Sequence, residues 1–71
     1  MTFSELRKEK HYTQQFLANQ LGVKQSTIAM WETGKSVPST NILLRLSDIL
    51  KVSVVDLYNS FDKVKEQKKN S

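Results

Sequence analysis

The chain has 71 residues, a formal net charge of +4 and no cysteine. Its length allows one domain with a small core, and its 38% hydrophobic and 25% charged residues are typical of a globular protein rather than a disordered one. The N-terminal stretch does not resemble a secretory signal, and no apolar run approaches the ~18 residues of a membrane helix. We therefore expect a single cytoplasmic domain that forms no disulfide and does not enter the membrane.

The apolar spacing predicts two helices in the first third of the chain. Thr2 or Ser4 can cap the first helix, since short polar side chains accept hydrogen bonds from the open N–H groups of a first turn. The second helix is expected over residues 14–21, after a capping Thr13. It ends at Gly22, which adopts a left-handed conformation without steric penalty.

A third helix is expected over residues 25–33, with Ile28 and Trp31 three positions apart on one face. Trp31 could be mistaken for a base-stacking residue, but this spacing favours a place in the core or at its edge. The small Ala18 on the preceding helix lets another helix cross closely. Together these features predict a helix-turn-helix, whose second helix is free to lie in a DNA groove.

The remainder of the chain predicts a fourth helix over about residues 40–50 and a short fifth over about 54–58. We assign residues 1–59 to the domain and residues 60–71 to a polar, lysine-rich tail that is expected to fray. Alternatively, the fifth helix continues, because apolar residues keep a helical spacing beyond it. These residues are Leu57, Phe61 and Val64.

The pattern resembles the Cro/phage-repressor type of helix-turn-helix, the xenobiotic-response-element family of bacterial transcriptional regulators. The residues that match are Leu6, Arg7, Thr13, Gln14, Leu17, Ala18, Leu21, Gly22, Val23, Gln25, Ser26, Thr27, Ile28, Trp31, Glu32, Gly34, Lys35, Pro38, Ser39, Leu43, Leu46, Leu50, Val52, Ser53 and Leu57. The resemblance implies an all-α fold, a compact five-helix lambda-repressor-like DNA-binding domain. Four positions depart from the family pattern. His11 and Lys51 replace helix-terminal glycines, Lys24 replaces a capping serine or threonine, and Met30 stands where the family often has a polar or basic residue.

The start of the third helix is where such a domain contacts base edges. The amide of Gln25 can bind adenine N6 and N7 together, and Ser26 can bond either a base or a phosphate. Ala29 and Met30 offer only apolar contact, most naturally to thymine methyl groups. The alternatives are a solvated helix surface for Gln25, and gap filling or a partner contact for Met30.

Other residues are expected to bind phosphate without reading sequence. Lys24 lies beside a helix N-terminus that can bind an anion, although a solvent-exposed lysine explains it nearly as well. For Lys35 the alternative is an ordinary loop lysine. The resemblance assigns phosphate contacts to Gln14, Thr27, Lys35 and Asn41.

The resemblance also implies an ion pair between Arg7 and Glu32, which would hold the first and third helices in a fixed geometry. We expect the dimer surface to be formed by apolar residues that the five-helix core does not obviously need. The candidates are Leu44, Val55, Tyr58 and Phe61. Of these, Leu44 and Val55 could equally belong to the edge of the core.

With one histidine, no cysteine and no convergent acid pair, the sequence offers no nucleophile–base couple and no zinc site. We expect no enzyme, metal or cofactor, but a transcriptional regulator that binds double-stranded DNA at the nucleoid. We expect it to be a repressor that binds a palindromic operator as a homodimer. The alternative is an antitoxin-like protein-interaction module of the same fold, whose tail folds onto a protein partner.

Overall fold

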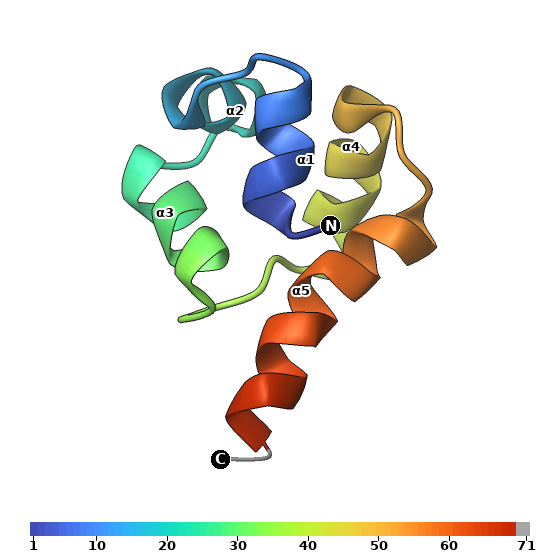
Figure 1. Cartoon of the computed structure of the whole chain (residues 1–71). Coiled ribbons are helices and arrows are strands. Elements are labelled where there is room, and N and C mark those ends of the chain that lie inside the picture. Colours follow the sequence, from blue (N-terminus) through green and yellow to red (C-terminus); the bar gives the residue numbers. More distant parts are fainter. Residues whose placement is uncertain (70–71) are drawn as a thin grey trace.

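The computed structural model describes the backbone of residues 1–69 and the side chains of residues 1–61. Its elements in order are α1 (Phe3–Glu9), α2 (Gln14–Leu21), α3 (Gln25–Thr33), α4 (Thr40–Leu50) and α5 (Val54–Lys69). Figure 1 shows α1 between α3 and α4, with α2 across one end and the second half of α5 extending away from the other helices. The described residues contain helices and no strands, so the expected all-α fold is confirmed.

Short polar side chains cap the N-termini of α1, α2 and α4. Thr2, rather than Ser4, caps α1: its hydroxyl accepts from the Glu5 N–H at 3.2 Å, and the Glu5 carboxylate accepts from the Thr2 N–H at 2.8 Å. Thr13 and Ser39 cap α2 and α4 through their hydroxyls alone, which accept from the N–H groups of Phe16 and Ile42. Each cap satisfies an N–H group that the helix itself leaves open.

Four residues adopt a left-handed conformation where helices or their C-terminal turns end. Gly22 and Gly34 follow α2 and α3 with φ values of 72° and 79°. His11 and Lys51 follow α1 and α4 with φ values of 60° and 59°. An L-residue with a Cβ pays a steric cost in this region that glycine does not. His11 and Lys51 therefore keep the left-handed backbone that a glycine would adopt at these helix ends, and they add local strain.

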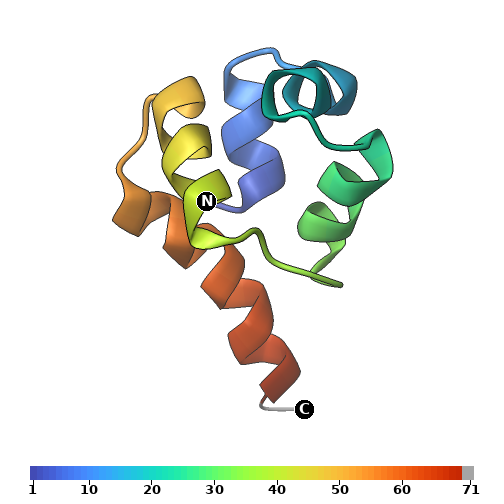
Figure 2. The same ribbon diagram turned by 180° about the vertical axis from the view of Figure 1, so that it is seen from behind.

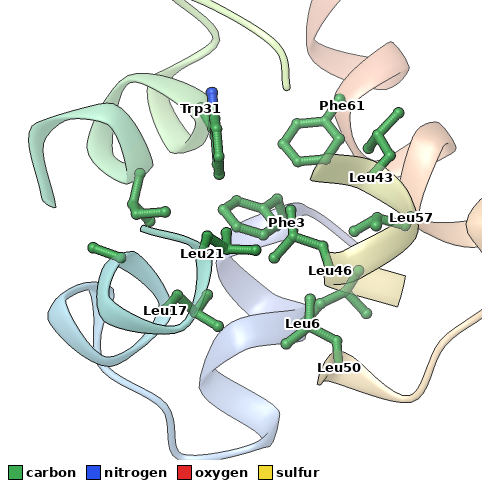
Figure 3. Close-up of a cluster of buried hydrophobic side chains, with 12 residues drawn as sticks. Phe3, Leu6, Leu17, Leu21, Trp31, Leu43, Leu46, Leu50, Leu57 and Phe61 are labelled. Atoms are coloured by element: carbon green, nitrogen blue, oxygen red, sulfur yellow. The ribbon is translucent and has the colours of Figure 1, made fainter. Parts of the chain in front are cut away.

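The core is built around Phe3, which lies between rings from two other helices (Figure 3). Its ring meets Trp31 edge-on at a centroid distance of 6.2 Å, and Phe61 at 4.8 Å with a tilt of 33°. Leucines from α1, α2, α4 and α5 complete the cluster. They are Leu6, Leu17, Leu21, Leu43, Leu46, Leu50 and Leu57.

The fifth helix runs on to Lys69, so the alternative of a continued helix is the one observed and an end near residue 58 is wrong. Phe61 is buried in the core beside Phe3, and Ser60 is also buried, with its hydroxyl donating to the Leu57 carbonyl. Packing thus extends past residue 59, the expected domain boundary. The side chain of Val64, and the proposed tail contacts beyond residue 61, lie outside the side chains that the structure describes.

Arg45 of α4 forms hydrogen bonds with α2 that the sequence did not predict. Its guanidinium donates to the Gln20 carbonyl at 2.8 Å and to the Leu21 carbonyl at 3.4 Å. These carbonyls belong to the last turn of α2, which has no intrahelical donors for them and carries partial negative charge. The arginine thus stabilises the end of α2 and fixes it against α4.

Within the described part of the chain, none of the helices has the length and apolarity needed to cross a bilayer.

Candidate nucleic-acid interface

The helix-turn-helix predicted from the sequence is formed by α2 and α3, which pack on each other. The turn passes through left-handed Gly22, and the Val23 N–H donates to the Ala18 carbonyl at 3.0 Å. Ala18 is fully buried, so its small side chain permits the close approach of the two helices. In both views, α3 lies at one side of the molecule (Figures 1 and 2).

The two sides of α3 differ in exposure. Ile28 is fully buried and Trp31 is nearly so, which confirms that the tryptophan is a core residue. By contrast, Gln25 and Ser26 are exposed at the start of the helix, and Met30 is 40% exposed. The fourth candidate for base contact, Ala29, is half-buried. One side of α3 is therefore packed in the core, while the residues of its first turn are accessible from outside. A helix that enters a DNA groove requires this arrangement.

The N-terminus of α3 has no side-chain cap, because Lys24 cannot accept a hydrogen bond. The Lys24 carbonyl accepts from the N–H groups of Thr27 and Ile28 at 3.0 and 3.4 Å. The N–H groups of Gln25 and Ser26 precede these and have no intrahelical acceptor. The helix end and the exposed ammonium of Lys24 both favour an anion at this position.

The candidates for phosphate contact lie on several elements. Lys24, Lys35 and Asn41 are exposed, whereas Gln14 and Thr27 are half-buried. The only acidic residue of α3 is Glu32, and its charge is compensated by Arg7. The nearby lysines thus face no unpaired carboxylate on this helix.

Arg7 and Glu32 form an ion pair between α1 and α3 with side chains only 12% and 11% exposed. Arg7 Nε donates to Glu32 Oε2 at 2.6 Å, and Arg7 Nη2 donates to Glu32 Oε1 at 3.4 Å. Arg7 Nη1 also donates to the Tyr12 carbonyl at 2.7 Å, in the turn between α1 and α2. One guanidinium therefore joins α1, the turn that follows it and α3. Its loss would leave a largely buried carboxylate without its charged partner.

Gln14 has partners that sequence reasoning missed. Its Nε2 donates to Glu32 Oε1 at 3.0 Å, and its Oε1 accepts from Gln25 Nε2 at 3.1 Å. Apolar periodicity carries no information about amide contacts between different helices, so no sequence signal predicted these two bonds. The side chain expected to contact phosphate is thus engaged within the protein, with one amide N–H and the α2 N-terminus remaining.

The candidate dimer residues fall into two groups. Val55, Leu44 and Tyr58 are 67%, 53% and 50% exposed on α4 and α5. Phe61 is 4% exposed because it completes the core, so its assignment to a dimer surface is wrong. Helical spacing could not separate the two groups, since it does not show which side of α5 faces Phe3.

Comparison with known proteins supports the assignment of α2 and α3 to a helix-turn-helix. The model of the HTH_3 family, described as helix-turn-helix, matches residues 3–57. The chain is 37% identical over 54 residues to the HTH-type transcriptional regulator AnsR of Bacillus subtilis (strain 168), covering 76% of this chain and 47% of that protein. It is 38% identical over 53 residues to the HTH-type transcriptional activator BcrR of Enterococcus faecalis, covering 75% of this chain and 26% of that protein.

The chain thus spans about half or less of the length of these curated relatives. No solved structure gave a significant match. The family model covers every helix of the bundle from α1 into α5, including the α2–turn–α3 unit described above. On this basis the chain belongs to the HTH_3 family of helix-turn-helix proteins.

Proposed function

We propose that the chain is the DNA-binding domain of a sequence-specific transcriptional regulator that inserts the start of α3 into the major groove. The observation that carries this proposal is the contrast along α3. Gln25 and Ser26 are exposed at its first turn, while Ile28 and Trp31 anchor its other side in the core. The transcriptional role is supported by both relatives, which are named as a transcriptional regulator and a transcriptional activator.

In this proposal, direct readout rests on a few side chains. The amide of Gln25 reads adenine through N6 and N7, and Ser26 bonds an adjacent base or phosphate. Ala29 and Met30 contact thymine methyl groups, which favours an operator rich in A·T pairs. Phosphate contacts that set the register come from Gln14, Lys24, Thr27, Lys35 and Asn41.

One such domain makes few base contacts, so we propose that it binds a palindromic operator as a homodimer. Two-fold symmetry would place the two copies of α3 one DNA turn apart, about 34 Å. The exposed apolar residues Leu44, Val55 and Tyr58 would form the contact between subunits. A dimer bound across a promoter would block access of RNA polymerase, so we propose that the protein acts as a repressor. Its proposed location is the cytoplasm, at the nucleoid.

Selection of bound duplexes from random DNA tests the proposed function directly. The expected result is an A·T-rich motif with two symmetric half-sites about 10 base pairs apart. Selection that enriches no motif, with binding lost at moderate salt, would overturn the proposal. That result would point to nonspecific attraction of a basic protein, or to an interaction module that acts through a protein partner.

A further inference from the structure

A continuous hydrogen-bonded chain links the interior ion pair to the first residue of α3. It runs from Arg7 to Glu32, from Glu32 to Gln14 and from Gln14 to Gln25, with closest N···O distances of 2.6, 3.0 and 3.1 Å. Exposure increases along this chain: Arg7 and Glu32 are nearly buried, Gln14 is half-buried and Gln25 is exposed. The outermost member is the residue proposed to read adenine.

The charge at the inner end sets the direction of every bond in the chain. An ionised carboxylate only accepts hydrogen bonds and a guanidinium only donates them. Glu32 therefore requires the Gln14 amide nitrogen to face it, which turns the Gln14 carbonyl oxygen toward Gln25. That oxygen in turn requires a donor, so the amide nitrogen of Gln25 faces Gln14.

This direction leaves Gln25 with its carbonyl oxygen and one N–H unused in the chain. Adenine presents one donor, N6–H, and one acceptor, N7, in the major groove. The two unused groups of Gln25 match that pair, and the amide is already oriented before DNA arrives. Orientation in the free protein reduces the conformational freedom lost on binding.

We propose that the Arg7–Glu32 ion pair is a positioning device for base recognition, which fixes the orientation of the Gln25 amide through Gln14. Stability alone explains the contacts of Arg7 with Glu32 and with the Tyr12 carbonyl. It does not explain why the same carboxylate also holds the amide that orients Gln25. This inference rests on the proposed function, because it concerns how α3 discriminates between bases.

The substitution Glu32→Gln tests the inference with little change in shape. Its neutral amide can either donate to or accept from Gln14, so it no longer imposes one direction. The probe is the duplex recovered by selection, compared with the same duplex carrying G·C at the pair that Gln25 reads. The ratio of the two affinities is expected to fall about three- to tenfold in the variant. This ratio does not depend on the fraction of protein that is folded.

The Arg45→Gln variant is the matched control. Arg45 also makes charged hydrogen bonds between helices, to the carbonyls of Gln20 and Leu21, but it takes no part in the chain. Its affinity ratio is expected to equal that of the wild type. An unchanged ratio in Glu32→Gln, or an equal fall in Arg45→Gln, would overturn the inference.

A second cycle separates positioning from direct contact. In a Gln25→Ala background, Glu32→Gln is expected to cause no further change in the affinity ratio, because the group that it orients is absent. If the two substitutions change the ratio independently, Glu32 does not act through Gln25. That outcome would contradict the proposed chain.

Side-chain amide NMR of the free protein tests the chain without DNA. The amide signals of Gln14 and Gln25 should be shifted from those of an unstructured glutamine, and Glu32→Gln should move both toward them. Arg45→Gln should leave both in place. Unshifted signals in the wild type would show that the hydrogen bonds of Gln14 and Gln25 do not form, which would overturn the inference. Shifted signals together with a selection that enriches no DNA motif would instead overturn the proposed function, and with it the role of Gln25 in base recognition.

Discussion

The rings of Phe3 and Phe61, which come from α1 and α5, lie with centroids 4.8 Å apart and planes tilted by 33°. Phe3 also contacts Trp31 of α3. One aromatic group thus joins the first helix to the last and to the helix proposed to read DNA. The fifth helix is therefore part of the packed domain at least as far as Phe61.

Replacement of Phe61 by alanine is expected to lower the free energy of unfolding by about 3 kcal/mol or more, because it leaves a cavity beside Phe3. A domain of this size has few kcal/mol to lose, so much of the protein would be unfolded at physiological temperature. Urea denaturation followed by circular dichroism measures the change. Tyr58→Ala on the same helix is the control, since Tyr58 is 50% exposed and its loss should have a small effect on monomer stability.

Replacement of His11 by glycine is expected to raise the free energy of unfolding by about 0.5–1 kcal/mol, because it relieves a left-handed conformation. His11 has a φ of 60° and is exposed, so the gain does not require the loss of a packed side chain. The same denaturation experiment measures it, and His11→Ala should instead be destabilising. A loss of stability in His11→Gly would show that the histidine side chain makes a contribution larger than the strain.

Replacement of Gln25 by alanine is expected to cost about 1–3 kcal/mol of binding to the selected operator and to relax the preference at one base pair. The melting temperature should hardly change, because the side chain is exposed. Competition binding with a panel of single-pair variants measures the preference. If the pattern of preferred bases survives intact, Gln25 is not a reading residue.

Replacement of Lys35 by alanine is expected to weaken binding to all duplexes by a similar factor, because a phosphate contact carries no sequence information. The dependence of log K on log salt should flatten by about one ion. Titrations at several salt concentrations, with the selected operator and with a scrambled duplex, measure both effects. A loss restricted to the operator would instead assign Lys35 to base contact.

Replacement of Val55 by glutamate is expected to weaken dimerisation at least about tenfold, because a charge would be buried at the proposed subunit contact. Val55 is 67% exposed in the single chain, so the fold should tolerate the change. Sedimentation equilibrium measures the association, and binding to a single half-site reports whether each subunit still functions. Unaltered dimerisation would place the subunit contact elsewhere on the molecule.

Local sequence patterns were sufficient to predict most of the bundle. Capping residues such as Thr13, the helix-ending Gly22 and the apolar spacing within α4 act over a few residues, so they can be read from the chain directly. The left-handed conformations of His11 and Lys51 were not evident from local pattern, since only the resemblance marked these positions as ones where the family has glycine. The pairing of Arg7 with Glu32 likewise came only from the resemblance to a known family.

Contacts between distant elements were not predictable in this way. The length of α5 was left open because Phe61 has the right spacing for a continued helix but needs Phe3, 58 positions earlier in the chain, to be buried. The bonds of Gln14 to Glu32 and Gln25 join polar residues, which leave no periodic pattern. Such contacts depend on how the helices are oriented relative to one another, which the structure shows and local sequence patterns do not.

The single tryptophan of the chain gives the protein an intrinsic fluorophore on the helix proposed to enter DNA. Trp31 is 5% exposed and packs edge-on against Phe3, so its emission should be blue-shifted while α3 is docked. Detachment of α3 from the bundle would expose the indole to water and shift its emission to longer wavelength. The docking of this helix can therefore be followed optically without a label.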